Sequence, residues 1–206
     1  MAEIFAMVSN VAKIELNPFR VFAVDCIFVL KIVTTMLQQY LAQQFESALL
    51  QLKNEINSYT HKENIWEVHG EIKNSGGTLV LHLLGNLNHF IGATLGNSGY
   101  VRNREAEFSE RNISSSAMMK STDELMYRVK EIVGNLTEAQ LFGEYPLKDG
   151  KPAKITVERL VQLLAHLHYH LGQLNYHRRL LEQPVSLPDG VDRLEKRNPV
   201  MQPYNQ

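Results

Sequence analysis

The chain has 206 residues, of which 44% are hydrophobic and 21% charged, with a formal net charge of -1 and a single cysteine. This composition is typical of one globular domain. The balanced charge argues against a nucleic-acid or anionic-membrane surface, and one cysteine excludes an intramolecular disulfide or a cysteine-based metal cage. We therefore expect a cytoplasmic protein in a reducing compartment, in which any metal site is built from the eight histidines.

Residues 1–35 differ in character from the rest of the chain. Their apolar segment, residues 21–30, is interrupted by Asp25 and is too short to span a bilayer. It is also a poor signal peptide, because no compact positive cluster precedes it. We interpret residues 1–35 as an N-terminal extension from a mis-called start, with Met36 as the true start. The shorter chain would contain no cysteine.

The first predicted helix follows this extension. Apolar residues from Leu37 to Tyr59 recur at steps of three and four, which is the pattern of an amphipathic helix in a bundle. Residues 60–67 are expected to form a connection, with Trp66 in the core.

The second predicted helix begins near residue 74 and ends at about Gly96-Asn97. It carries His82 and Asn86 one turn apart, and His89 continues the same face. Gly85 and Gly92 each cost about 1 kcal/mol relative to Ala in a helix interior. They predict that a neighbouring helix or a ligand approaches closely here.

Residues 98–120 are expected to form a long loop, and long loops in compact domains are often functional. Their dense alternating charge fits a solvated loop. The alternative is a segment over the mouth of a site, where Arg102 or Arg104 would meet an anionic substrate group.

The third predicted helix runs from Ser121 to about Asn135, and Ser121 and Glu124 have the spacing of a capping box. Residues 136–155 are rich in turn formers and are expected to connect it to the last helix, with a short hairpin at 148–151.

The fourth predicted helix covers Thr156 to Gln183, with Thr156 as N-cap and Pro184 as the stop. His166 and His170 lie one turn apart on it, a spacing at which two imidazoles can bind one metal ion. Histidines satisfied by hydrogen bonds are the alternative.

Other polar residues flank this pair. Gln173 and His177 continue the same edge, whereas His168 points elsewhere. Residues 184–206 lack apolar periodicity and are expected to form a C-terminal tail. The expected fold is therefore an all-α four-helix bundle over residues 36–183, with long connections between helices two and three and between helices three and four.

Two sequence segments carry a resemblance to a known family. Residues 81–87 (LHLLGNL) and residues 166–173 (HLHYHLGQ) resemble the DinB-like superfamily of four-helix-bundle metalloproteins. Within the superfamily the chain most resembles an uncharacterised bacterial branch, through residues 74–75, 86–92 and 102–108. The resemblance implies a divalent metal held by His82, His166 and His170. Leu171 departs from the family pattern, which often has arginine there.

The family includes thiol-dependent transferases, so the resemblance implies a metal-dependent thiol S-transferase acting on a small-molecule substrate, as a homodimer. Three neutral imidazoles suit Zn²⁺ best, and Ni²⁺ or Fe²⁺ also fit. The thiol would be a low-molecular-weight compound. Asn86 and Gln173, together with Arg102 and Arg104, are the candidates for binding it or for orienting an imidazole.

Two alternatives stay open. A metal-dependent hydrolase is disfavoured because no Asp or Glu lies within residues 81–87 or 166–173 as an obvious general base. The other is a non-catalytic, dimeric, stress-associated metal-binding bundle. The sequence identifies no catalytic residue and does not decide whether the protein is an enzyme.

Overall fold

The fold is that of a computed structural model, which describes residues 18–146 and 154–182. The described part is all-helical, and its β-type pairing is limited to an isolated bridge between Glu144 and Ile155. The elements are α2 (Pro18–Asn57), the 3₁₀ helix η1 (Lys62–Trp66), α3 (Gly76–Leu87), the π-helix η2 (Asn88–Ala93), α4 (Arg104–Ser109), α5 (Ser115–Gly134), α6 (Glu138–Phe142) and α7 (Thr156–Leu181). No helix in the described ranges is long and apolar enough to cross a membrane.

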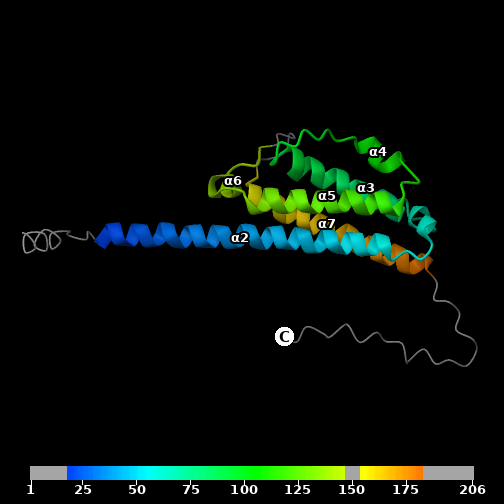
Figure 1. Cartoon of the computed structure of the whole chain (residues 1–206), viewed down its shortest axis with the longest axis horizontal. Helices are drawn as coiled ribbons and strands as arrows, with labels where there is room; N and C mark the ends of the chain where they lie inside the picture. Colours follow the sequence, from blue (N-terminus) through cyan, green and yellow to red (C-terminus); the bar gives the residue numbers. More distant parts are fainter. Residues whose placement is uncertain (1–17, 147–153, 183–206) are drawn as a thin grey trace, which may run out of the picture.

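Helix α2 is the longest element and begins well before the predicted start at Leu37. Pro18 is its first residue, a position that suits proline because the missing N–H has no partner there in any case. The helix passes residue 36 without a break, and its N-terminal end projects beyond the other helices (Figure 1). Here Val33 and Met36 are exposed, whereas Phe45 and Leu49 further along are fully buried. The sequence periodicity marked the packed part of α2 rather than the whole helix.

The core lies where α2, α3, α5 and α7 meet. Helix α2 packs against α5 and α7, and α3 packs against the same two helices. Large buried side chains from every one of these helices fill the space between them: Phe45, Leu49, Leu52, Leu83, Leu87, Met118, Leu125, Leu160 and Leu167. Burial of this apolar surface is what holds the helices together.

Trp66 ends η1 and lies against the N-terminal turn of α3. It is partly buried and packs on the core, as expected. A Cβ atom on Gly77 would lie 2.5 Å from the Trp66 ring, so only glycine allows this contact. Ser75 caps α3 and accepts a hydrogen bond from the Thr78 N–H at 3.1 Å.

The predicted start of the third helix at Ser121 is wrong. Helix α5 begins at Ser115, and Ser114 is its N-cap, accepting a hydrogen bond from the Ala117 N–H at 3.2 Å. Ser121 is an exposed residue inside the helix. Ahead of Ser121, Ser115 and Met118 continue the buried face of the helix.

The two long connections also contain short helices that the sequence did not predict. Residues 98–120 include α4, which Asn103 caps by accepting a hydrogen bond from Ala106 N–H at 3.0 Å. Residues 136–155 include α6, capped by Thr137. Helices of five or six residues are too short to show a hydrophobic period. The hairpin expected at 148–151 and the tail at 184–206 lie outside the described residues.

Helix α7 begins at Thr156, but Thr156 is not its N-cap as predicted. Ile155 occupies that position, and the Thr156 hydroxyl instead donates to the Gly143 carbonyl at 3.4 Å. The second predicted helix corresponds to α3 and the π-helix η2 that continues it to Ala93, so the change to a π-helix is what the sequence did not predict. Asn97, where the stop was expected, has the left-handed φ of 49°.

Candidate metal centre

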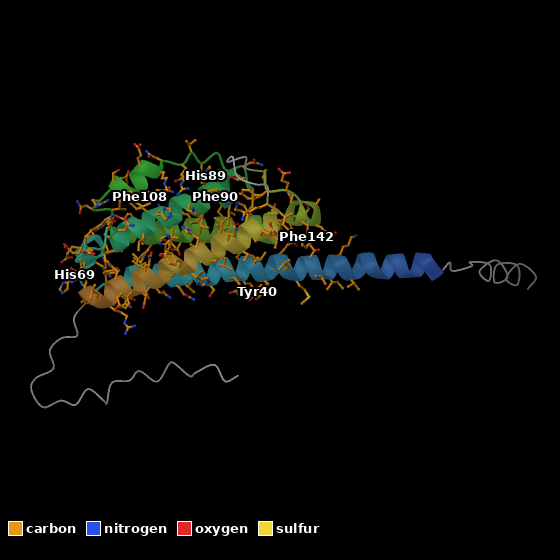
Figure 2. All side chains as sticks on the ribbon, turned by 180° about the vertical axis from the view of Figure 1, so that it is seen from behind. Tyr40, His69, His89, Phe90, Phe108 and Phe142 are labelled. Atoms are coloured by element: carbon orange, nitrogen blue, oxygen red, sulfur yellow. The ribbon has the colours of Figure 1, made fainter. Side chains whose placement is uncertain are left out.

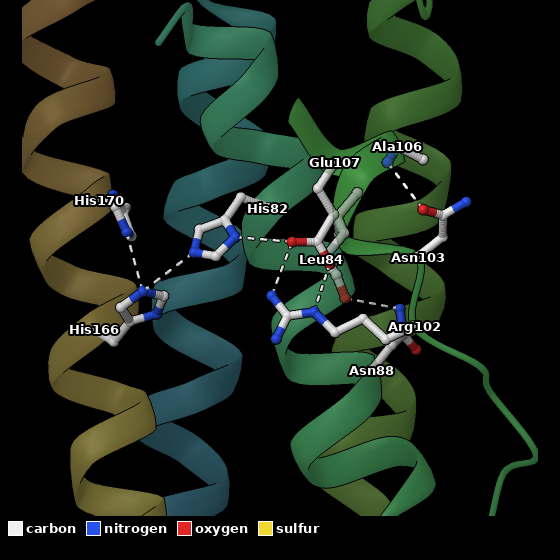
Figure 3. A network of polar contacts seen from close by, with 9 residues as sticks. All are labelled: His82, Leu84, Asn88, Arg102, Asn103, Ala106, Glu107, His166 and His170. Carbon is white, nitrogen blue, oxygen red and sulfur yellow. Dashed lines mark hydrogen bonds and ion pairs between the residues drawn. The ribbon is translucent and has the colours of Figure 1, made fainter. Parts of the chain in front are cut away.

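Helices α3 and α7 run antiparallel and bring three histidines together. Contacts of Gly76 with Leu174 at one end and of Phe90 with Arg159 at the other fix this direction. Between these ends, His82 of α3 faces His166 and His170 of α7 (Figure 3). The structure thus brings together the three histidines that the sequence singled out.

The Nε2 atoms of the three rings converge. The distance from His166 Nε2 is 3.3 Å to His82 Nε2 and 3.0 Å to His170 Nε2, and the three potential ligand atoms all lie within 4.8 Å of one another. Tetrahedral Zn²⁺ with bonds of about 2.0–2.1 Å places its nitrogen ligands roughly 3.3 Å apart. The spacing of the three nitrogens therefore fits a divalent metal.

The outward nitrogens of two of these rings have fixed partners. His82 Nδ1 lies 2.9 Å from Glu107 Oε2, and His170 Nδ1 lies 2.6 Å from Gln173 Oε1. Both partners are acceptors, so each ring carries its proton on Nδ1 and presents the Nε2 lone pair to the centre of the cluster. Converging lone pairs repel one another, and a cation between them removes that repulsion.

Burial favours the neutral form, which a metal ligand requires, in two of the three histidines, His82 and His166. Burial, together with the neighbouring His170 and His82, lowers the pKa of His166 to about 4. Burial also lowers the pKa of His82, against the opposing effect of Glu107. His82 is 7% exposed, whereas the two histidines of α7 are partly exposed, so the centre opens to solvent on the α7 side.

Glu107 on α4 is the main residue that the sequence interpretation missed. Its side chain is 5% exposed, and Arg102 binds both carboxylate oxygens, with Nε to Oε1 at 2.6 Å and Nη2 to Oε2 at 2.8 Å. Burial alone would raise the pKa of Glu107, but the hydrogen bonds from Arg102 and His82 outweigh it and lower that pKa. Glu107 is therefore an anion at neutral pH that holds His82 in place.

Gly85 makes this approach of Glu107 possible. A Cβ atom at Gly85 would lie 2.2 Å from Glu107 Oε1, and only a glycine avoids that clash. The expected close neighbour of Gly85 is thus a carboxylate from α4. This glycine, one turn after His82, was the signal in the sequence that could have indicated Glu107.

The two arginines differ in what they meet. Arg102 was a candidate for an anionic substrate group, but the anion that it binds is Glu107. Arg104 lies over the Phe108 ring, 5.3 Å from its centroid, and that ring lies 5.1 Å from the His82 ring. Phe108, His89 and Phe90 gather on the side of the molecule away from α2 (Figure 2).

The remaining candidates take different positions. Gln173 lies beside His170, as expected for a residue that orients an imidazole. Asn86 is 7% exposed, and its Oδ1 has no hydrogen-bond partner among the described residues. His89 contacts the Phe90 ring, and His177 bonds to Tyr59 and to the Glu67 carbonyl, so neither belongs to the cluster.

Comparison with known proteins places the chain in a family. No curated protein and no solved structure matches it. Residues 32–186 match the model of a family described as "Protein of unknown function (DUF1572)". This match covers most of the chain and includes every residue of the histidine cluster, Glu107 and Gln173. The chain therefore belongs to this family of unknown function.

Proposed function

We propose that the protein is a divalent-metal-dependent enzyme of the DinB-like four-helix-bundle type, and that it transfers a group to a small-molecule thiol. The pairwise packing of α2, α3, α5 and α7 supports the bundle. The observation that carries the metal site is the convergence of three Nε2 atoms, two of which belong to rings whose opposite nitrogens bind Glu107 and Gln173.

His82, His166 and His170 would hold the metal and leave at least one coordination position for another ligand. A divalent cation bound by three neutral imidazoles keeps its full charge, and this charge favours the thiolate form of a thiol that reaches it. The protein residues orient the site: Glu107 fixes the His82 ring, and Gln173 fixes the His170 ring. Carboxylate and amide partners of this kind set the tautomer and direction of ligand imidazoles.

The thiol has to come from outside the histidine-bearing region. The single cysteine, Cys26, precedes residues 32–186, which form the family match. We propose that a low-molecular-weight compound, rather than Cys26, supplies the nucleophilic sulfur. In the transfer, the sulfur forms a bond to carbon of the electrophile, the bond to the leaving group breaks, and the thiol proton passes to solvent.

The position of Glu107 favours transfer over hydrolysis. A hydrolase needs a group that can take the proton from an attacking water. Glu107 is the carboxylate next to the cluster, but both of its oxygens already accept hydrogen bonds from Arg102 or His82. Its lowered pKa also makes it a weak base.

The first test is metal content, measured by plasma mass spectrometry on protein purified without a histidine tag. Near-stoichiometric Zn²⁺, Ni²⁺ or Fe²⁺ is expected in the wild type and in His168→Ala, whose exposed side chain lies on the same helix outside the cluster. His166→Ala should lose the metal. Wild-type protein that stays empty after incubation with these metals would contradict the proposal.

The second test is turnover, with cysteine as the thiol and monobromobimane as the electrophile. Metal-dependent formation of the thioether, with release of bromide, would support a transferase. Hydrolysis of p-nitrophenyl acetate that requires metal but no thiol would instead identify a hydrolase.

A further inference from the structure

A cavity of about 560 Å³ lies beside the histidine cluster, between the N-terminal part of α3 with the residues before it and the C-terminal half of α7. Its size is in the range of small-molecule sites. Two of its residues connect it to the cluster. Gln173 lines the cavity and accepts the hydrogen bond of His170, and the ring of Tyr169, another lining residue, contacts the His170 ring at 5.1 Å between centroids.

The lining has an apolar part that is left open to solvent. Tyr169 is 63% exposed, Tyr176 70% and Ile72 41%. Exposed apolar side chains gathered around one hollow are characteristic of binding sites rather than of plain surface. The two tyrosine rings suit a flat or aromatic body.

The described lining residues carry a positive charge and no negative one. Lys73 contributes an ammonium group, and none of the described lining residues is acidic. The ion pairs between described residues do not include Lys73, and its ammonium group lines the cavity. Asn74 and the amide NH₂ group of Gln173 add hydrogen-bond donors. This set of groups favours a carboxylate.

Gly172 gives a second, independent indication. It lies in the interior of α7, where glycine costs about 1 kcal/mol relative to alanine. At Gly76, Gly77 and Gly85 a neighbouring group would clash with a Cβ atom, but at Gly172 nothing lies within 4 Å. Packing therefore does not explain this glycine. It lines the cavity, and any larger residue would take up space there.

We infer that this cavity binds a small organic anion with an apolar or aromatic body and a carboxylate, with Lys73 as the partner of the carboxylate and Gly172 providing the room. The inference extends the function proposed above, since a compound bound here lies next to His170 and Gln173. It names the substrate class as carboxylate-bearing thiols or carboxylate-bearing electrophiles.

The test uses two probes of equal shape, phenylacetate and its neutral analogue phenylacetamide. Their affinities for full-length, metal-loaded protein are measured by ligand-observed NMR titration. Wild-type protein should prefer phenylacetate. Lys73→Met should remove this preference, a change of roughly two- to fivefold for one exposed ion pair. Lys120→Met, which removes an exposed lysine of α5, should leave it unchanged.

Gly172→Phe is the second variant, because its side chain would occupy the cavity. It should weaken binding of both probes by roughly tenfold or more, while the metal content stays at the wild-type value. Far-UV circular dichroism checks that α7 remains folded.

The outcomes separate the inference from the proposed function. Equal binding by wild type and Gly172→Phe, or no binding by metal-loaded wild type, would overturn the inference and leave the metal site intact. Binding that persists in a wild-type protein unable to hold metal would support the cavity and remove the proposed function.

Discussion

Glu107 has a positioning role at the level of the single residue, because its carboxylate joins a buried arginine to a candidate metal ligand. We predict that Glu107→Gln lowers metal affinity by about 10- to 100-fold, as changes to partners of ligand histidines do. The variant should also unfold more easily, by about 1–3 kcal/mol, since Arg102 loses its counter-charge while 13% exposed. Isothermal titration with Zn²⁺ and urea denaturation measure the two effects.

Glu105→Gln is the matched control for this prediction. Glu105 lies on the same short helix but is exposed and outside the histidine network. Wild-type metal affinity in Glu107→Gln would show that Glu107 has no role in orienting His82.

A pH dependence follows from His166. Its pKa is lowered from 6.5 to about 4 in the folded chain, so as the pH falls the unfolded chain takes up this proton first. The metal-free protein should therefore lose stability as the pH falls from about 6.5 towards 4, and His82, whose pKa is also lowered, acts in the same direction. Denaturant midpoints across this range, compared with those of His166→Gln, test this. A midpoint in wild type that does not change below pH 6.5 would contradict it.

At the scale of the element, the same glycine-to-alanine substitution should change the stability of the fold in opposite directions at two helix positions. Gly85→Ala should destabilise the protein by about 1–3 kcal/mol and weaken metal binding, because the new methyl group displaces Glu107. Gly172→Ala should stabilise it by about 0.5–1 kcal/mol, because it meets open space and removes the helix cost of glycine. Urea denaturation of both variants gives the comparison, and equal shifts would contradict it.

The start of α5 gives a second prediction at this scale. Ser114→Ala should destabilise the protein by about 1 kcal/mol, since it removes the N-cap hydrogen bond to Ala117. Ser121→Ala, at an exposed position inside the helix, should be neutral or slightly stabilising. Thermal unfolding of the two variants distinguishes the real cap from the apparent capping box.

These residues also show what the sequence can and cannot predict. The histidine pair of α7 was predictable because its geometry is local: residues four apart share a helix face. The boundaries of α5 and α2 were predicted less well, since a buried stripe marks where a helix packs and not where it begins. Glu107 was not predictable from periodicity, because a six-residue helix has no period and its place beside His82 is set by tertiary packing.

For the whole molecule, metal binding should stabilise the fold, because the cluster joins α3 to α7. At a free metal concentration of about 100 times Kd, the gain should be about 2.7 kcal/mol. Wild-type protein should therefore melt at a higher temperature with Zn²⁺ than with a chelator, whereas His166→Ala should melt at the same temperature in both. Differential scanning calorimetry makes the comparison, and a wild-type curve insensitive to chelator would contradict it.

The separation of the histidines along the chain has a consequence for folding. His82 and His166 are 84 positions apart, whereas His166 and His170 are neighbours on one helix. In the unfolded chain, closing a segment of this length costs entropy, so an ion can engage the adjacent pair long before the distant partner arrives. High affinity then appears only after α3 has docked on α7. Tight binding of the ion therefore requires the non-local contact between α3 and α7. Its uptake should follow the slow, late phase of folding rather than the formation of α7 itself.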